Sequence, residues 1–159
     1  MDDKFNLLLK EANKAFNTAD HLAYVSYPLL KDNKLLLAIA NNLYLSGIKS
    51  IGVVLYYEKL NKRIDTLPLD YDNIIFVFEN QVVNRMKLNK EIIRVIRELK
   101  IVLNQHSQSP LEFSRKNKFV ICNNDYSKIK ALDITMLKVY IGVIRSFIEF
   151  IGGLGQNNV

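Results

Sequence analysis

Apolar side chains recur at steps of three and four residues along most of the sequence, which is the pattern of amphipathic helices. The first such stretch spans residues 4–30. Pro28 is expected to kink or end this helix, because proline lacks the donor of a helical hydrogen bond. After a polar turn at 31–34, the pattern predicts a second helix at about 35–62, antiparallel to the first. This second helix is apolar over much of its circumference, which places it at the centre of the fold.

The middle of the chain begins with a loop at Asp65–Asp72 and continues with a helical pattern over 72–104. This pattern fits either one bent helix or two helices, the second at about 90–104 with Asn89 as its N-cap. The apolar run at 74–78 also fits a short strand. The sequence leaves these alternatives open.

The last third of the chain mixes strand and helix patterns. Residues 105–117 are expected to be irregular, and about 118–132 to form a β-hairpin. A final helix is predicted at about 134–151, where a glycine pair ends it and leaves 152–159 as a flexible tail. The predicted fold class is all-α: an antiparallel helical bundle of about five helices with a small β-hairpin before the last helix. Residues 4–151 form its single domain.

The composition is that of an ordinary globular domain, with 159 residues, 49% hydrophobic and 24% charged. These values exclude disordered and collagen-like chains. The single cysteine, Cys122, cannot form an intramolecular disulfide or a cysteine-based zinc site alone. Other metal ligands lack useful spacing, so we expect no metal and no cofactor.

One segment of the chain has the length of a membrane span, but the pattern as a whole favours a protein that does not enter a membrane. The start at Met1–Lys4 is acidic and lacks the pattern of a secretory signal. Residues 35–57 are long enough to cross a bilayer and carry one formal charge, at Lys49. Polar residues are distributed along this segment, however, which favours a buried core helix. We therefore expect a cytoplasmic protein that does not bind a membrane.

The formal net charge of +6 is concentrated in one segment. Residues 85–130 contain 11 Lys and Arg against 4 Asp and Glu, and the rest of the chain is near neutral. Such an excess is typical of surfaces that bind nucleic acid, acidic proteins or anionic lipid, and also of solvated helix faces.

Four cations share one side of the predicted helix at about 90–104, opposite its apolar stripe. Neighbours along such a side are about 5–6 Å apart, close to the spacing of phosphates along a nucleic-acid strand. Glu91 and Glu98 lie off the centre line and are not expected to neutralise it fully. This pattern predicts a contact with a phosphate backbone. The four cations, named the basic strip, are Lys87, Lys90, Arg94 and Arg97.

A second cluster places cations beside aromatic rings around the start of the predicted hairpin. Single-stranded nucleic acids are bound by this combination, because cations contact phosphates and rings stack on bases. The cations, named the basic loop, are Arg115, Lys116 and Lys118. The rings are Phe113, Phe119 and Tyr126.

The order of the predicted elements over residues 4–151 resembles that of HEPN-type helical proteins. This family includes RNA-cleaving toxins, inactive relatives and nucleic-acid-binding partners, so the resemblance implies a helical fold associated with RNA. The family's ribonuclease signature is an arginine and a later histidine with four to six residues between them. Here Arg97 and His106 have eight residues between them, which places them on opposite sides of a continuous helix at ~100° per residue. The signature is not met.

These patterns lead to one preferred function and two alternatives. The preferred hypothesis is a non-catalytic module that binds nucleic acid, RNA in particular, through the basic strip and the basic loop. The first alternative is a protein-interaction module that self-associates, as a homodimer, through the second or the final helix. The second alternative is a HEPN-like ribonuclease with His106 as its catalytic residue. No Gly-rich phosphate loop, His-Glu-x-x-His or Gly-x-Ser-x-Gly motif indicates an enzyme.

Overall fold

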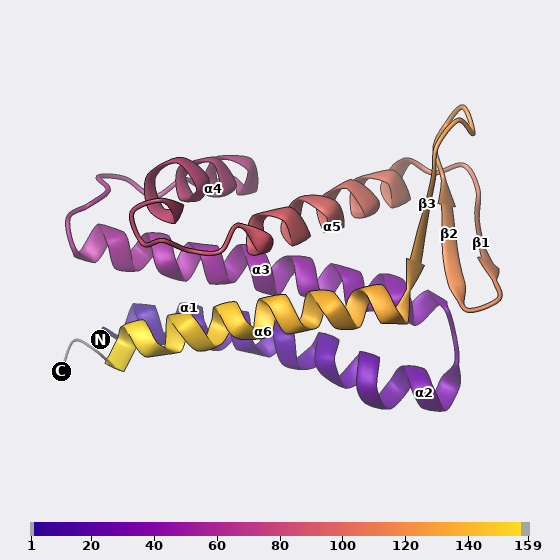
Figure 1. Ribbon diagram of the computed structural model, residues 1–159, viewed down its shortest axis with the longest axis horizontal. Coiled ribbons are helices and arrows are strands. Elements are labelled where there is room, and N and C mark those ends of the chain that lie inside the picture. Colours follow the sequence, from indigo (N-terminus) through magenta and orange to yellow (C-terminus); the bar gives the residue numbers. More distant parts are fainter. Residues whose placement is uncertain (1, 157–159) are drawn as a thin grey trace.

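The computed structural model describes residues 2–156 and shows a mostly helical chain with one small antiparallel sheet at one end (Figure 1). The prediction of a mainly helical protein is confirmed, whereas a sheet of three strands replaces the predicted hairpin. The elements are α1 (Asp3–His21), η1 (Leu22–Ser26), α2 (Tyr27–Leu30), α3 (Lys34–Leu60), α4 (Tyr71–Val77), η2 (Phe78–Val83), α5 (Glu91–Gln108), β1 (Glu112–Arg115), β2 (Lys118–Cys122), β3 (Ile129–Asp133) and α6 (Ile134–Gln156), where η1 and η2 are π-helical.

The first helical stretch runs from α1 through η1 to α2, as the apolar stripe predicts. The Asp2 side chain accepts the Phe5 backbone N–H at 2.8 Å and so caps α1. Pro28 does not end the helix, because it lies in the first turn of α2, where a missing N–H is tolerated. The stretch ends instead at Leu30, after which Lys31 adopts a left-handed conformation with φ of 48°.

Helix α3 is the core helix, and α1, α5 and α6 pack around it (Figure 1). Leu36, Leu43 and Ile51 are each fully buried on it. Within residues 2–156, α3 is the one helix long and apolar enough to cross a membrane, and 61% of its most apolar window is buried inside the fold. This burial is typical of the core helix of a soluble protein.

Residues 72–104 form separate helices, so the bent-helix and strand alternatives are both wrong. Helix α4 begins after Asp70, whose side chain accepts the Asn73 N–H at 2.9 Å. A turn at 84–90 precedes α5, whose N-cap is Lys90 and not the predicted Asn89. The Asn89 side chain still accepts the Glu91 N–H at 2.9 Å, one residue before the cap. Helix α5 continues to Gln108, into the segment expected to be irregular.

The sheet has the strand order β1-β2-β3, and β1 also lies in the segment expected to be irregular. On the face toward the helices, Phe119, Ile121 and Leu132 are buried. The opposite face pairs Phe113 with Val120 across the β1–β2 ladder. The sheet therefore adds an open face to an otherwise helical molecule.

The glycine pair that was expected to end the last helix does not end it, because α6 continues to Gln156. Tertiary packing explains the extension: Ile151 is fully buried and Leu154 packs against the core. Gly155 also approaches the Phe5 ring so closely that a Cβ would lie 3.2 Å from Cε1. Of the predicted flexible tail, 152–156 is helical and 157–159 lies outside the described residues.

Candidate nucleic-acid interface

Ion pairs neutralise much of the basic strip at the start of α5. Arg94 Nη2 lies 2.7 Å from Glu91 Oε2, and Arg94 Nη1 lies 3.0 Å from Glu98 Oε1. The two carboxylates raise the pKa of Arg94, and the Arg94 guanidinium lowers the pKa of Glu91. Glu91 and Glu98 therefore both pair with Arg94, although the sequence places them off the centre line of the basic strip.

Acidic residues from α4 and η2 neutralise the next turn of the same helix face. Arg97 forms a bidentate pair with Glu79 of η2, and Lys100 pairs with Asp72 of α4. Glu79 precedes Arg97 by 18 positions and Asp72 precedes Lys100 by 28, so helical spacing alone does not reveal these contacts. This face of α5 is therefore a partly exposed surface of ion pairs.

Glu98 also joins α5 to α6, whereas the other two cations of the basic strip are unpaired among residues 2–156. The Tyr140 hydroxyl of α6 donates a hydrogen bond to Glu98. Burial and this hydrogen bond raise the pKa of Tyr140 to about 12. Lys87 and Lys90 are exposed and have no ion-pair partner among residues 2–156.

The basic loop forms the tight turn between β1 and β2. Arg115 and Lys118 are cross-strand partners, and Lys116 between them adopts a left-handed conformation with φ of 53°. All three side chains are exposed. None has an ion-pair partner in the described part of the chain, in contrast to Arg94 and Arg97.

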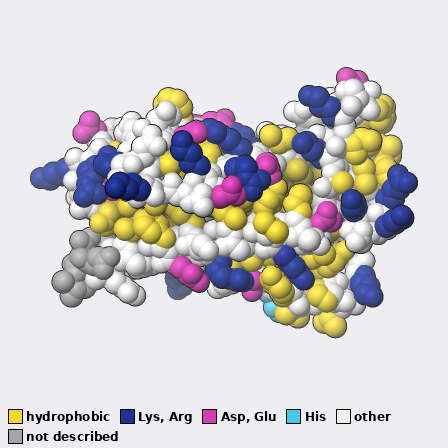
Figure 2. All heavy atoms as spheres, viewed as in Figure 1, with side chains coloured by type: hydrophobic (Ala, Val, Ile, Leu, Met, Phe, Trp, Pro, Cys, Tyr) yellow, Lys and Arg dark blue, Asp and Glu magenta, His cyan; other side chains and the backbone are white. Residues whose placement is uncertain are grey.

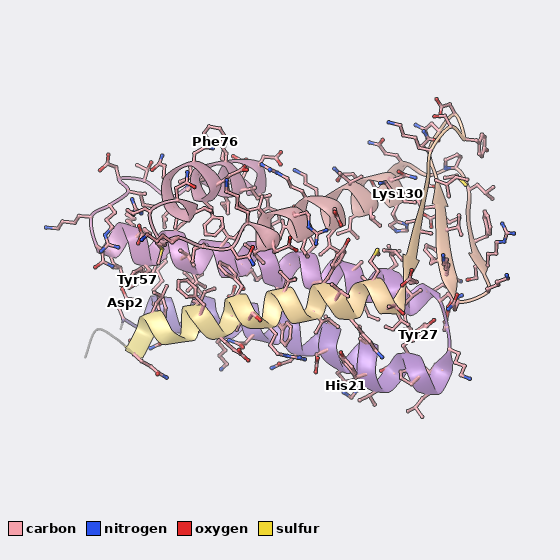
Figure 3. The ribbon with its side chains drawn as sticks, viewed as in Figure 1. Asp2, His21, Tyr27, Tyr57, Phe76 and Lys130 are labelled. Atoms are coloured by element: carbon pink, nitrogen blue, oxygen red, sulfur yellow. The ribbon has the colours of Figure 1, made fainter. Side chains whose placement is uncertain are left out.

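Asn33 fixes this turn against the connection between α2 and α3. Its side-chain amide donates to the Lys116 carbonyl at 2.8 Å and to the Lys118 carbonyl at 3.3 Å. The Tyr27 hydroxyl, at the base of the sheet in Figure 3, donates to Asn33 Oδ1 at 3.0 Å. Asn33 is only 8% exposed, so these bonds are largely shielded from water. The turn therefore has a fixed position.

The Asn33 contact also brings Lys31 and Lys34 to the same end of the molecule, where both side chains are exposed. Asp32 and Asp133 lie at this end too, and each accepts a backbone N–H, from Lys34 at 3.0 Å and from Met136 at 2.8 Å. Figure 2 shows Lys and Arg side chains beside hydrophobic surface at this end, on the right. The cationic end comprises Lys31, Lys34, Arg115, Lys116 and Lys118.

The open face of the sheet places one aromatic ring beside these cations. Phe113 is 40% exposed and Ile129 is 64% exposed, and both line an open groove of about 330 Å³ with the basic loop. Val120 forms the floor of this groove. Phe119 is buried on the other face, and Tyr126 lies in the turn between β2 and β3 at the opposite end of the sheet. Of the three predicted rings, the structure brings Phe113 alone to the basic loop.

The basic strip and the basic loop do not form one surface. Helix α5 begins near the middle of the molecule, whereas the β1–β2 turn lies beside the α2–α3 connection at the far end (Figure 1). The end of α5 meets the other end of β2, where the Ser109 hydroxyl donates to the Cys122 carbonyl at 2.6 Å. The last turns of α5 and the length of β2 therefore separate the two clusters.

The geometry does not assemble a ribonuclease signature. His106 lies in the last turn of α5, with Nδ1 2.5 Å from Glu112 Oε1. Because α5 is continuous from Arg97 to His106, nine residues at ~100° each place the two on opposite sides. His21 ends α1, away from both (Figure 3). No group of three potential metal ligands occurs within residues 2–156.

Several residues of this interface were not identified from the sequence. Asn33, Lys31 and Lys34 were assigned only to a polar turn, because no local signal shows that this turn contacts residues 116–118. Ile129 could have been identified, since strand alternation places it on the same face as Phe113 once the register is known.

No family model matches this chain, and neither the curated proteins nor the solved structures contain a match to it. The resemblance to HEPN-type proteins therefore stays a prediction from the order of the helices.

Proposed function

We propose that this protein binds single-stranded nucleic acid, RNA in particular, without cleaving it, at the cationic end and the adjoining sheet face. The observation that carries the proposal is the state of the charges. The cations of the cationic end have no ion-pair partners in the described part of the chain, whereas Arg94 and Arg97 are neutralised. The proposal includes a cytoplasmic location and an antiparallel, HEPN-like bundle of helices that carries the sheet as its binding element.

The arrangement suits a flexible strand for two physical reasons. Phosphates that contact Arg115, Lys116 and Lys118 release condensed counterions, which favours binding. A base can stack on Phe113, beside these cations in the same groove, and such a stack contributes about 1–3 kcal/mol per base. Neither contact reads the hydrogen-bonding edge of a base, so the preference for particular sequences should be small.

The test is a binding titration with fluorescently labelled single-stranded RNA, single-stranded DNA and both duplexes, repeated at several salt concentrations. For three or four phosphate contacts, the slope of log affinity against log salt should be about −2 to −3 on single strands, from ~0.7 per phosphate. Replacing two cations, as Arg115→Gln with Lys116→Gly, should flatten this slope by about 1.4. Glycine suits the left-handed position of Lys116 and should preserve the turn while it removes the charge.

Two matched controls make the test specific. Arg94→Gln with Arg97→Gln removes the same number of cations from the ion-paired face, and the slope should stay within about 0.3 of the parent value. Phe113→Ala should weaken binding by about 1–3 kcal/mol, whereas Phe76→Ala, which removes another ring that is 61% exposed, should not. Figure 3 shows Phe76 on α4, far from the sheet.

Absence of binding to all four nucleic acids, or binding that does not depend on salt, would overturn this proposal. If Arg115→Gln with Lys116→Gly and Arg94→Gln with Arg97→Gln flatten the salt slope equally, positive charge favours binding without a defined site. Cleavage of RNA that disappears in His106→Ala would instead support the ribonuclease alternative.

A further inference from the structure

A second surface of the molecule is apolar and lies away from the cationic end. It is a groove of about 600 Å³ between α6, the turn at 84–90 and the start of α5. Val139 and Phe150 on its α6 side are 57% and 36% exposed. Figure 2 shows hydrophobic side chains along this side of α6, in the left half of the view. An apolar groove of this size on the surface of a soluble protein indicates an interaction site.

The charges beside this groove have opposite signs on its two sides. Lys87 lines the groove on the side of the turn, Lys90 directly precedes α5, and neither has an ion-pair partner within residues 2–156. Glu91 also lines this side, but its carboxylate is paired with Arg94. Glu149 on α6 is also exposed and without such a partner. Gly142 lines the groove at one edge of this helix face, and seven residues at ~100° per residue place Glu149 only about 20° from it. Glu149 is about 120° from Val143 and therefore lies on the outer flank of the groove, opposite the side of Lys87 and Lys90.

We propose that a second copy of this chain occupies the groove, with α6 of each copy lying in the groove of the other. A two-fold axis parallel to α6 leaves every residue at the same height along the helix direction. It also places each flank of α6 in one copy beside the opposite flank of the groove in the other copy. Glu149 of the second copy then faces Lys87 and Lys90 of the first. The turn at 84–90 lies beside the C-terminal half of α6, which is the half that contains Glu149 (Figure 1). Glu149 of one copy and the lysines of the other are therefore at similar heights along α6.

A second copy fits this surface because the same face supplies both partners of every contact. The groove accepts a helix, and α6 is a helix whose exposed face carries Val139 and Phe150. Between these two residues, Gly142 and Ser146 line the groove and allow two helices to approach closely. Both charges needed for the pairing are also present in each copy. A partner of different sequence would not have to meet all of these conditions.

The first experiment measures the oligomeric state by sedimentation and light scattering over a range of protein concentrations. The parent chain should form a dimer. Phe150→Glu and Val143→Glu should each weaken the dimer by at least about 100-fold, because a carboxylate would be buried in an apolar contact. Phe76→Glu, on another exposed aromatic residue, should leave the dimer unchanged. Circular dichroism establishes that each variant is folded, and Val139→Glu replaces any variant that is not.

The second experiment exchanges the charges. Glu149→Lys alone, or Lys87→Glu with Lys90→Glu, should weaken the homodimer about tenfold, because like charges then face each other. A mixture of these two variants should form a heterodimer of parental affinity, because every facing pair is again of opposite sign. Lys10→Glu on α1, also exposed, is the matched control and should change nothing.

A monomer at all concentrations up to about 1 mM would overturn the proposal. So would a dimer that persists in Phe150→Glu and in Val139→Glu, or charge variants that do not recover on mixing. Nucleic-acid binding is a separate outcome, because no residue of the cationic end lines this groove.

Discussion

Gly47 occupies the closest approach between α3 and α5 among the described glycines. A Cβ at this position would lie 2.8 Å from Cγ1 and 2.9 Å from Cδ1 of Ile96, and the Ile96 side chain is fully buried. Gly47→Ala should therefore lower the free energy of unfolding by about 1–3 kcal/mol, the cost of overpacking a core. Denaturant unfolding measures this change.

Gly52 on the same helix provides the matched control. A Cβ there would meet nothing within 4 Å. Gly52→Ala should raise the free energy of unfolding by about 0.5–1 kcal/mol, because alanine loses less backbone entropy in a helix. Equal effects of the two substitutions would contradict the close packing of α3 against Ile96.

Glu58 shows how one buried charge organises two loops. Its side chain is fully buried near the end of α3, with Arg63 Nη1 3.0 Å from Oε1 and with Arg85 at its other oxygen. Both arginines are partly exposed and come from the loops that follow α3 and η2. Because a buried carboxylate requires such partners, Glu58 fixes the start of the turn that forms one wall of the apolar groove.

At the scale of elements, the sequence predicts the helices whose apolar residues recur with helical spacing. The apolar stripes of α1 and α5 have helical spacing, and both helices occur where the stripes place them. Strand β1 was missed because it is an edge strand with exposed side chains and so lacks alternating apolar positions. The end of α6 was missed because packing of Ile151 and Leu154 outweighs the low helix propensity of glycine.

The contact between the β1–β2 turn and the α2–α3 connection depends on the Asn33 side chain. Asn33→Ala removes both amide donors to the β1–β2 turn and leaves the Tyr27 hydroxyl without its acceptor. We expect a loss of about 1–3 kcal/mol in the free energy of unfolding. Hydrogen exchange at the β1–β2 turn should accelerate while that of α3 changes little, and the affinity for single strands should fall with it.

Asn80→Ala is the control for this substitution. The Asn80 amide donates at 2.8 Å to Phe76 within its own helical stretch and is exposed. Its loss should cost less than about 0.5 kcal/mol. If Asn33→Ala has no larger effect than this, the turn does not depend on the buried amide.

At the scale of the whole molecule, the excess positive charge of residues 85–130 is ion-paired on α5 and, among residues 2–156, unpaired at the β1–β2 turn. On α5, acidic residues from α4 and η2 neutralise it through contacts such as Arg97 with Glu79. At the sheet, no acidic side chain pairs with Arg115 or Lys116 in the described part of the chain. The sequence correctly located the excess and both clusters. It could not separate ion-paired from unpaired cations, because Glu79 and Asp72 are distant in the chain from Arg97 and Lys100. The partners of Arg94, Glu91 and Glu98, are near in the chain but were expected to lie off the centre line of the basic strip.

Tyr140 joins α5 to α6 and should make global stability depend on pH at alkaline values. Burial and the bond to Glu98 raise the pKa of Tyr140 to about 12, from an ordinary value of 10.0. Above pH 10 the tyrosine ionises in the unfolded chain but stays protonated in the folded one. The unfolded state is therefore favoured progressively until the pH reaches about 12.

Comparison with Tyr140→Phe isolates this effect from the titration of lysines and other tyrosines. Between pH 10 and about 12, the parent should lose about 2–3 kcal/mol more of its free energy of unfolding than the variant loses. At neutral pH the variant should already be less stable by about 1.5–3 kcal/mol, because the hydrogen bond to a charged acceptor is missing. Parallel pH profiles of the two proteins in denaturant unfolding would contradict a buried, protonated Tyr140.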